Sequence, residues 1–324
     1  MRRAEASAPG KIILFGEHFV VKGYRAIATS TSLRARVSVE EIREPGIVIE
    51  SENLNIKGSL NLNLEGNVPR ELLVYVEILR ALRERGFNMI PHRARLKSSM
   101  PISAGLGSSA STSVAYALAY TALHGDPLKG RDLLEVSLEG EKVAHGRPSG
   151  IDNTIATLGG TIVYRRGEEP LKVEVNIPEG YTFLIADTGV KRSTREAVEH
   201  VLKLAESLWK IASLIYEAAD KIVEEALKAL KTGDVKTLGP LMYVNHGLLN
   251  AIGVSHEKLD AIVYEARKHG ALGAKLTGAG WGGCAIILAR EGDIENLAEK
   301  ISKHTVTIEK AKINVEGATI DYNS

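Results

Sequence analysis

The segment 101–113 combines glycine and serine in a pattern that is suited to holding an anion. It reads Pro-Ile-Ser-Ala-Gly-Leu-Gly-Ser-Ser-Ala-Ser-Thr-Ser, and an Ala-rich apolar stretch typical of a helix follows it. Gly105 and Gly107 permit a tight turn and a close approach of the backbone to a ligand. Ser108 and Ser109 are favourable N-cap residues, so we expect a helix to begin there. The N–H groups and the dipole at such an end attract phosphate, and the segment therefore predicts a phosphate-binding loop.

The same segment also matches the dinucleotide-binding pattern G-x-G-x-x-G/A through Gly105, Gly107 and Ala110. That pattern belongs to an opening βαβ unit, and an acidic residue at the end of a strand follows about twenty residues later. Here the match begins only after residue 100, and residues 124–127 form a polar turn, His-Gly-Asp-Pro. The dinucleotide interpretation is therefore disfavoured, whereas a purely structural Gly/Ser loop stays open for this segment alone.

Two carboxylates stand near a second rigid turn. Residues 145–153 read His-Gly-Arg-Pro-Ser-Gly-Ile-Asp-Asn, and the helical stretch before them carries Glu141 towards its end. The turn could fold Asp152 back towards Glu141, which would place two acids beside the glycine loop. Asp152 is also a good N-cap for a short helix at 153–158, and taken alone the capping interpretation is favoured.

Polar residues also border an apolar run near the N-terminus. A Pro-Gly turn at 9–10 precedes Lys11, residues 12–15 suit a buried strand, and Glu17 and His18 then follow a glycine. Taken alone, Lys11 is most simply a solvated surface lysine, and His18 is most simply a hydrogen-bonded structural histidine.

A third glycine-rich segment, 275–288, reads Lys-Leu-Thr-Gly-Ala-Gly-Trp-Gly-Gly-Cys-Ala-Ile-Ile-Leu. Four glycines within six residues exclude a stable helix or strand, and an apolar, strand-like run follows them. This pattern indicates a second wall of a cleft. Cys284 is expected to be a small buried residue rather than a nucleophile.

Hydrophobic periodicity predicts the elements that would position these groups. Strands are expected at 26–41, in short stretches of 46–65, and at 92–99, 161–164 and 181–186, with a hairpin at 19–24. Helices are expected at 71–85, 132–143, 195–231, 234–249 and 257–269. We place a domain boundary near residue 179, which divides the chain into 1–178 and 179–324.

Composition limits the class of protein. A chain of 324 residues exceeds what one core usually serves, and 44% apolar with 25% charged residues is typical of soluble globular proteins. A net charge of +1 argues against nucleic-acid and anionic-membrane partners.

A single cysteine excludes an intrachain disulfide and a Cys-based zinc site. No signal-peptide core and no apolar run of ~18 residues occur, so we expect a cytoplasmic protein. The lack of glutamine is typical of thermophiles.

Several catalytic patterns are absent from the sequence, among them Walker A, the protein-kinase His-Arg-Asp and Asp-Phe-Gly, and His-Glu-x-x-His. The chain offers instead two glycine-rich loops, a lysine on the first strand and two acids near the first loop. Phosphoryl transfer from a nucleotide requires such a set, namely a loop, metal ligands, a base and a cation.

Three segments together resemble the motifs of the GHMP kinases, the family of galacto-, homoserine, mevalonate and phosphomevalonate kinases. They are 9–18, 101–110 and 275–280, and they stand in the family's order. Residues 16–23, 140–153 and 187–195 are most similar to the mevalonate kinase branch. One departure is Trp281, because the family's third motif often continues with glycine at this point.

This resemblance implies ATP-dependent phosphorylation of the 5-hydroxyl of mevalonate in isoprenoid biosynthesis. It implies an α/β (α+β) fold of two domains, the N-terminal one like ribosomal protein S5 and the C-terminal one ferredoxin-like. Cofactors would be ATP and Mg²⁺, the partners would be small-molecule substrates, and a homodimer stays open. The alternatives are another GHMP kinase acting on phosphomevalonate, homoserine or a sugar, and a non-catalytic nucleotide- or sugar-sensing relative.

The resemblance also assigns roles to individual residues. Mg²⁺ would be coordinated by Ser109 and Glu141. Asp152 would accept the proton of the attacking hydroxyl, and Lys11 would keep that carboxylate ionised. Mevalonate would be contacted by Glu17, His18, Asp152, Arg192 and Thr194. The ATP phosphates would be held by Pro101, Ser103, Ala104, Gly105, Leu106, Gly107, Ser108, Ser109, Ala110, Gly278 and Gly280.

Overall fold

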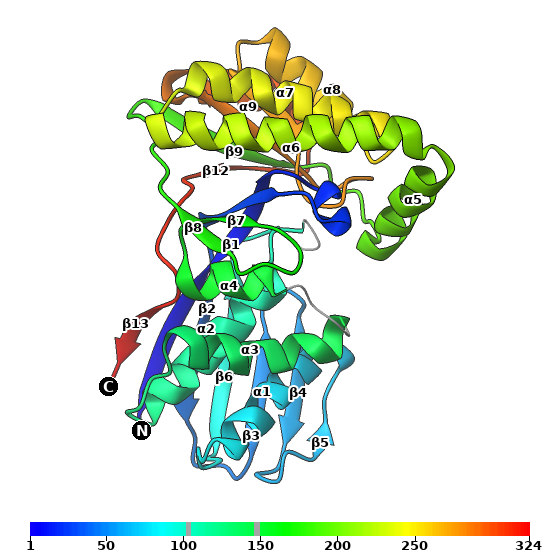
Figure 1. The fold of residues 1–324 in the computed structure, drawn as a ribbon. Coiled ribbons are helices and arrows are strands. Elements are labelled where there is room, and N and C mark those ends of the chain that lie inside the picture. Colours follow the sequence, from blue (N-terminus) through cyan, green and yellow to red (C-terminus); the bar gives the residue numbers. More distant parts are fainter. Residues whose placement is uncertain (102–104, 146–149) are drawn as a thin grey trace.

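The structure is a computed structural model that describes residues 1–101, 105–145 and 150–324 (Figure 1). Within these ranges the chain forms a larger and a smaller β-sheet, each with helices packed against it. Figure 1 shows the larger sheet, with both chain termini, in the lower part and the smaller sheet in the upper part. The expected α/β class with two parts is therefore confirmed. None of the helices in the described part of the chain is long and apolar enough to cross a membrane.

The larger sheet is mostly antiparallel and is built around two long strands. Its strands are β1 (Arg3–Phe15), β2 (Ala26–Glu41), β3 (Ile47–Ser51), β4 (Ile56–Leu60), β5 (Gly66–Asn67), β6 (His92–Ser98), β7 (Thr161–Tyr164), β8 (Leu171–Val173) and β13 (Thr319–Asn323). Their order is β13-β1-β2-β6-β3-β4-β5, and β7 pairs with the start of β2 and with β8. Only the β3–β6 pairing is parallel among the strand pairs described. Strand β13 brings the end of the chain back to β1, while the domain division near residue 179 stays a prediction.

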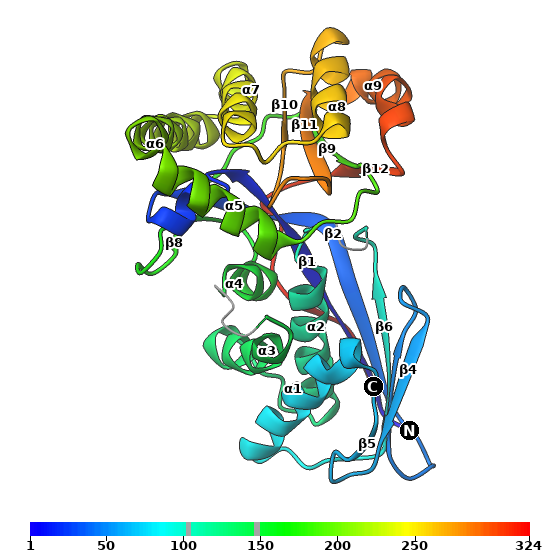
Figure 2. The same ribbon diagram turned by 90° about the vertical axis from the view of Figure 1, so that its right-hand side faces the viewer.

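One face of the larger sheet carries α1 (Leu73–Glu84), α2 (Ser108–Leu123), α3 (Gly130–His145) and α4 (Ile151–Leu158), as Figure 2 shows. Helix α2 is the central one, since every residue from Ala110 to Leu123 is buried. Its many Ala residues let the neighbouring elements approach closely, and this packing holds the start of the helix in place.

The smaller sheet is antiparallel throughout, in the order β10-β11-β9-β12. Its strands are β9 (Tyr181–Asp187), β10 (Gly273–Leu276), β11 (Cys284–Arg290) and β12 (Thr307–Ala311). The helices of this part are α5 (Thr194–Ser207), α6 (Trp209–Thr232), α7 (Val235–Ala251), α8 (Glu257–Lys268) and α9 (Ile294–Ile301).

Hydrogen bonds tie the three glycine-containing segments together. The backbone N–H of Lys11 donates to the carbonyl of Leu106 at 2.8 Å. The hydroxyl of Thr277 accepts from the N–H of Ile13 at 3.1 Å and donates to its carbonyl at 2.9 Å. Strand β1 therefore contacts both the loop before α2 and the loop after β10, and it fixes their relative position.

Two local expectations are wrong. Residues 19–24 do not form a hairpin, because Phe19–Lys22 is a 3₁₀ turn that Gly23 ends in a left-handed conformation. Phe19 is fully buried, and its ring meets Tyr216 at 5.2 Å, so tertiary packing overrides the β-branched composition here. The turn expected at 9–10 is instead an irregularity within β1, where the pairing with β2 shifts register.

The long helix expected at 195–231 is two helices. Leu208, with φ −124° and ψ 36°, interrupts the helical backbone, and α6 continues in a new direction. A single helix over 195–231 would carry one apolar stripe, of which Val201 and Ala205 are buried, whereas Leu208 and Trp209 are 54% and 50% exposed. The stripe is not continuous because the change of direction turns its two halves towards different surroundings.

Candidate functional site

The start of α2 is shaped by glycine rather than by serine caps. Gly107 is the N-cap residue, with φ 76°, and no side chain caps this end, so the predicted capping role of Ser108 and Ser109 is wrong. The Ser108 hydroxyl donates to Ser98 Oγ at 3.1 Å, and the Ser109 hydroxyl donates to Glu141 at 2.6 Å. Since the first N–H groups of a helix lack intrahelical acceptors, this end is suited to bind an anion.

The carboxylate of Asp152 lies beside this helix start. Helix α4 has Gly150 as its N-cap, so Asp152 lies in the first turn and the capping interpretation is wrong. Its Oδ1 stands 3.3 Å from the ammonium Nζ of Lys11, a residue that is 8% exposed. A Cβ at Gly107 would lie 3.1 Å from Lys11 Cγ and 3.6 Å from Asp152 Oδ2. The structure therefore brings the predicted base, the predicted cation and the glycine loop together.

Glu141, on α3, contacts the first turns of α2. It is 5% exposed, and its Oε1 accepts from Ser109 Oγ at 2.6 Å and from Ser113 Oγ at 3.4 Å. Ser109 and Glu141 thus form the predicted pair of oxygen groups. The described residues contain no cluster of three or more His, Cys, Asp or Glu side chains that could hold a metal. A metal here would need further ligands from water or a substrate, and phosphate-bound Mg²⁺ has this property.

The guanidinium of Arg192 lies between the two glycine-rich loops. A Cβ at Gly105 would stand 2.0 Å from Arg192 Nη2, one at Gly278 would stand 3.1 Å from the same atom, and one at Gly283 would stand 2.6 Å from Nε. Glycine at these positions is therefore what admits the guanidinium. Burial lowers the pKa of Arg192 from its ordinary value, although a guanidinium remains charged. Sequence similarity predicted Arg192, and the structure places it beside both loops.

His18 is buried against the loop that follows β10. It is 6% exposed, and its Nε2 lies 2.9 Å from the carbonyl oxygen of Ala279. Burial lowers the pKa of His18 to about 4, with a smaller contribution from the charge of Arg192, so the ring is neutral near pH 7. Its Nδ1 is buried and has no hydrogen-bond partner among the residues that the structure describes. Such an atom is available to a bound substrate.

Glu17 is paired with other side chains of the protein, and its contact with an acceptor stays a prediction. Its carboxylate forms an ion pair with Lys275 in which neither side chain is exposed, and Asn245 Nδ2 donates to it at 3.2 Å. In this structure the carboxylate has no exposed surface to offer a substrate. Its direct contact with mevalonate was expected from the motif, and the pattern alone did not reveal that Lys275 neutralises it.

The remaining predicted residues take different positions. Thr194 is exposed at the first position of α5, after the cap residue Ser193. Leu106 and Ala110 are buried beneath the loop, Pro101 is half-buried, and Ser103 and Ala104 lie outside the described residues. Packing also requires glycine at position 280, because a Cβ there would lie 1.9 Å from the carbonyl oxygen of Val254.

A cavity of about 170 Å³ opens beside Ser108 and Ser109. The sequence analysis did not identify it, because the tip of β3–β4, the start of α1 and the end of β6 meet only in three dimensions. Its lining residues are Ser51, Asn53, Leu54, Glu71, Tyr75, Leu96, Ser98, Met100, Ser108, Ser109 and Thr112.

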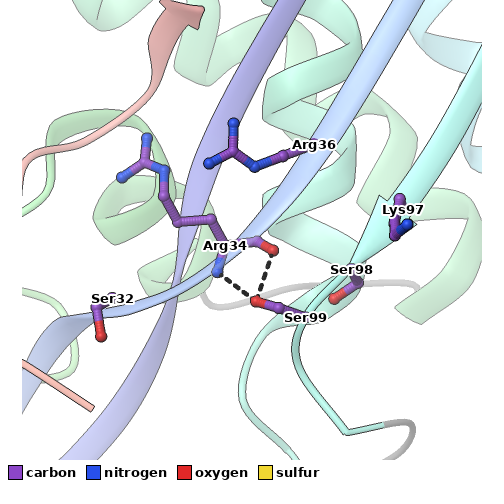
Figure 3. A pocket seen from close by; sticks show the side chains of 6 residues that line it. All are labelled: Ser32, Arg34, Arg36, Lys97, Ser98 and Ser99. Carbon is purple, nitrogen blue, oxygen red and sulfur yellow. Dashed lines mark hydrogen bonds between the residues drawn. The ribbon is translucent and has the colours of Figure 1, made fainter. Parts of the chain in front are cut away.

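A second cavity, of about 250 Å³, lies between β2 and the end of β6 and is drawn in Figure 3. Its three cationic side chains already have partners. Arg34 donates to Ser7, to the carbonyls of residues 316 and 317 and to Thr319. Arg36 pairs with Asp321 at 2.7 Å and Lys97 with Glu52 at 3.4 Å. The contacts of Arg34 and Arg36 attach the C-terminal segment to the sheet, so this cavity belongs to the framework.

Known proteins share both the sequence and the fold. The model of the GHMP kinases N terminal domain matches residues 73–161, and that of the GHMP kinases C terminal matches residues 226–306. The mevalonate kinase of Aeropyrum pernix is 48% identical over 323 residues, 99% of each chain. The mevalonate kinase of Pyrococcus furiosus is 39% identical over 88% of each chain.

Solved structures of mevalonate kinases are similar to this fold. The Methanococcus jannaschii mevalonate kinase has a TM-score of 0.86 at 31% identity, covering 95% of this chain and 98% of its own. The L. major mevalonate kinase in complex with R-mevalonate has a TM-score of 0.82 at 28% identity, covering 96% and 95%. Fold and site together define an ATP-dependent kinase of small molecules. The chain belongs to the GHMP kinase family.

Proposed function

We propose that this chain transfers the γ-phosphoryl group of ATP to the 5-hydroxyl of mevalonate, which gives 5-phosphomevalonate and ADP for isoprenoid biosynthesis. The observation that carries this function is the close match, over the whole chain, to a mevalonate kinase. The position of the Lys11–Asp152 pair beside the start of α2 supplies the chemistry that such a reaction needs.

The phosphates of ATP would lie at the start of α2. The N–H groups of this turn and the dipole of α2 favour phosphate oxygens there. The adjacent cavity is lined by Ser108, Ser109 and Thr112, so it is suited to receive the rest of the nucleotide. On the opposite side, Gly278 and Gly280 would let the loop after β10 approach the transferred phosphoryl group.

Ser109 and Glu141 would hold Mg²⁺ through their oxygen atoms. The ion would neutralise charge on the phosphates when bound. The hydroxyl–carboxylate contact of 2.6 Å shows that both oxygens reach one point, and Mg²⁺ prefers oxygen ligands. Two protein ligands are typical of a Mg²⁺ that phosphate and water complete.

Asp152 would accept the proton of the attacking hydroxyl. A carboxylate is a much weaker base than an alkoxide, so the proton moves as the O–P bond forms and not before. Lys11 Nζ, 3.3 Å from the carboxylate, would stabilise negative charge that develops on the alcohol oxygen.

The carboxylate end of mevalonate would meet Arg192, and one of its hydroxyl groups would meet His18. A guanidinium binds a carboxylate in a bidentate manner, and its burial strengthens the attraction. His18 is neutral and donates through Nε2 to the carbonyl of Ala279, so its buried Nδ1 would accept a hydrogen bond from a hydroxyl of the acceptor. Glu17 would act indirectly by holding the backbone before His18, and Thr194 would contribute only if α5 approaches the site more closely.

The charges of this region favour mevalonate over two other acceptors of the family. Homoserine carries an ammonium next to its carboxylate, and Arg192 would repel this ammonium. Glu17 would not compensate the ammonium, because its carboxylate is already paired with Lys275. Galactose has no carboxylate for the buried guanidinium to bind. A neutral acceptor would therefore lack this charge-assisted contact, which lowers its kcat/KM relative to mevalonate.

A coupled assay of ADP release with Mg-ATP tests this function directly. The acceptors would be mevalonate, phosphomevalonate, homoserine and galactose, and ³¹P NMR would identify the product as a phosphate monoester. We expect turnover with mevalonate and at least about hundredfold lower kcat/KM with the others. Turnover with another acceptor but not mevalonate would assign a different member of the family. Binding of ATP and mevalonate without turnover would indicate a sensing protein.

All groups invoked in this mechanism come from one chain, so we propose that catalysis requires no macromolecular partner. A homodimer and a cytoplasmic location stay predictions. Sedimentation equilibrium would measure the first, and fractionation of cells would measure the second.

A further inference from the structure

Trp281 adopts a backbone conformation that a bulky residue rarely takes. Its φ is +55°, and it stands among Gly280, Gly282 and Gly283, which all have positive φ. A bulky aromatic residue in this region is a genuine outlier, and it persists only where surrounding contacts hold it. The GHMP motif often has glycine at this position, which would avoid the strain. A tryptophan here therefore calls for a compensating function.

The indole of Trp281 is anchored to the segment after α7. Its Nε1–H donates to the carbonyl of Gly253 at 2.8 Å, and its backbone N–H donates to the carbonyl of Val254 at 2.8 Å. The close approach of Val254 to Gly280 leaves no room for this segment to shift towards the loop. One hydrogen bond thus holds the ring, and the second holds the backbone of the same residue.

This ring contacts α5 through His200. The ring centroids are 5.3 Å apart, with an interplanar angle of 56°. A Cβ at Gly253 would lie 2.8 Å from His200 Nε2, so the imidazole packs directly on the residue that accepts the indole hydrogen bond. That nitrogen is buried and has no hydrogen-bond partner among the described residues. The contact is therefore retained at an energetic cost.

Helix α5 packs on the core of the smaller sheet through small and branched residues. It projects from the end of α6 in Figure 1, and its buried residues are Ala197, Val201 and Ala205. The segment just before it carries Arg192, whose guanidinium lies between the two loops. His200 is about 9 Å along the axis from Thr194, the first residue of the helix. A contact at His200 consequently limits how far the start of α5 can move.

We propose that Trp281 and His200 are positioning residues that attach α5 to the loop after β10 and so hold Arg192 for the carboxylate of the acceptor. This inference rests on the proposed function of Arg192. The attachment organises the site before the acceptor binds, so its loss weakens acceptor binding more than it slows the chemical step. Trp281 thereby anchors the loop to α5 through its side chain, which a glycine at this position could not do.

A double-mutant cycle of Trp281→Gly and Arg192→Ala tests the proposal. We expect Trp281→Gly to raise KM for mevalonate about tenfold, with kcat and KM for ATP within about threefold. His200→Ala should act in the same direction, and Trp209→Phe, at the other and exposed tryptophan, should leave all three constants unchanged. In the Arg192→Ala background, Trp281→Gly should change KM for mevalonate by less than about twofold.

Amide hydrogen exchange gives a readout that does not depend on activity. In Trp281→Gly, residues 194–200 should exchange faster, while the α2 core should exchange as before. An unchanged KM for mevalonate in Trp281→Gly, or an equal increase in both backgrounds, would overturn the proposal. If Arg192→Ala itself leaves KM for mevalonate unchanged, the assigned role of Arg192 fails instead, so the two failures are distinguishable. Glycine suits the positive φ of position 281, so this variant is expected to fold.

Discussion

The ammonium of Lys275 and the carboxylate of Glu17 form an ion pair in which neither side chain is exposed to solvent. Lys275 also donates to the carbonyl of Leu276 at 2.6 Å, and Asn245 Nδ2 donates to the second carboxylate oxygen at 3.2 Å. Glu17 directly precedes His18, and Lys275 directly precedes the loop that carries Gly278 and Ala279. The ion pair therefore links the segment that carries His18 to the loop after β10.

Removing one member of this pair should be strongly destabilising. Lys275→Met would leave a buried carboxylate without its cation, and we expect a loss of about 3–5 kcal/mol in the free energy of unfolding. Urea denaturation of the variant and of the parent chain measures it. Glu17→Gln combined with Lys275→Met should recover much of the loss, since no buried charge remains unmatched. A loss below about 1 kcal/mol in the single variant would contradict this account.

Replacing Asp152 by Asn should abolish turnover while ATP binding stays nearly normal. The amide preserves the shape of the side chain but does not accept the proton of the attacking hydroxyl, so we expect kcat to fall by at least ~10²–10⁴. Steady-state kinetics measure the first effect, and calorimetric titration with ATP measures the second. The exposed Asp126 provides a matched control, because Asp126→Asn should leave both unchanged. Full activity of Asp152→Asn would show that another group is the base.

Glu141→Gln should raise the Mg²⁺ concentration needed for half-maximal activity by at least about tenfold. The amide keeps a hydrogen bond with Ser109 but removes the negative charge that attracts the ion. Activity measured over a range of Mg²⁺ at saturating ATP shows the shift. Glu139, which lies on the same helix and pairs with Lys142 at 2.6 Å, provides the control variant Glu139→Gln. An identical Mg²⁺ dependence of Glu141→Gln would exclude Glu141 as a ligand.

Acid should destabilise the fold through buried histidines. His92 is 0% exposed, its Nε2 lies 3.0 Å from Tyr116 Oη, and burial lowers its pKa to about 4 from an ordinary 6.5. Above pH 6.5 the ring is neutral in both states. As the pH falls from 6.5 to 4, the unfolded chain binds a proton that the folded chain does not bind, so stability falls.

The size of this effect for His92 is about 3 kcal/mol. Denaturant unfolding between pH 8 and pH 4 would measure it, and His92→Gln should show a correspondingly shallower fall than the parent chain. The two proteins would be compared as differences from their own values at pH 8, which removes the cost of the substitution itself. Equal slopes in both would show that His92 does not carry this dependence.

Much of the fold follows from local patterns. The alternation at 26–41 predicted β2, and the apolar spacing at 71–85 predicted α1 within two residues at its start and one at its end. The hairpin expected at 19–24 failed because the burial of Phe19 against Tyr216 comes from α6, which lies far along the chain. The strands β12 and β13 were not predicted, since their pairing partners, β9 and β1, lie much earlier in the sequence.

The sequence by itself determined which chemistry is present: a Gly/Ser loop before a helix, two acids, a lysine and a second glycine-rich loop. Turns and helical or strand periodicity depend on residues close together in the sequence, and so they can be predicted from it. Only the tertiary structure decided that Asp152 faces Lys11 and does not cap its own helix. It likewise paired Glu17 with Lys275 and placed Arg192 between Gly105 and Gly278. Burial and charge pairing arise where segments remote in sequence meet, and each such contact depends on the packing of the whole chain.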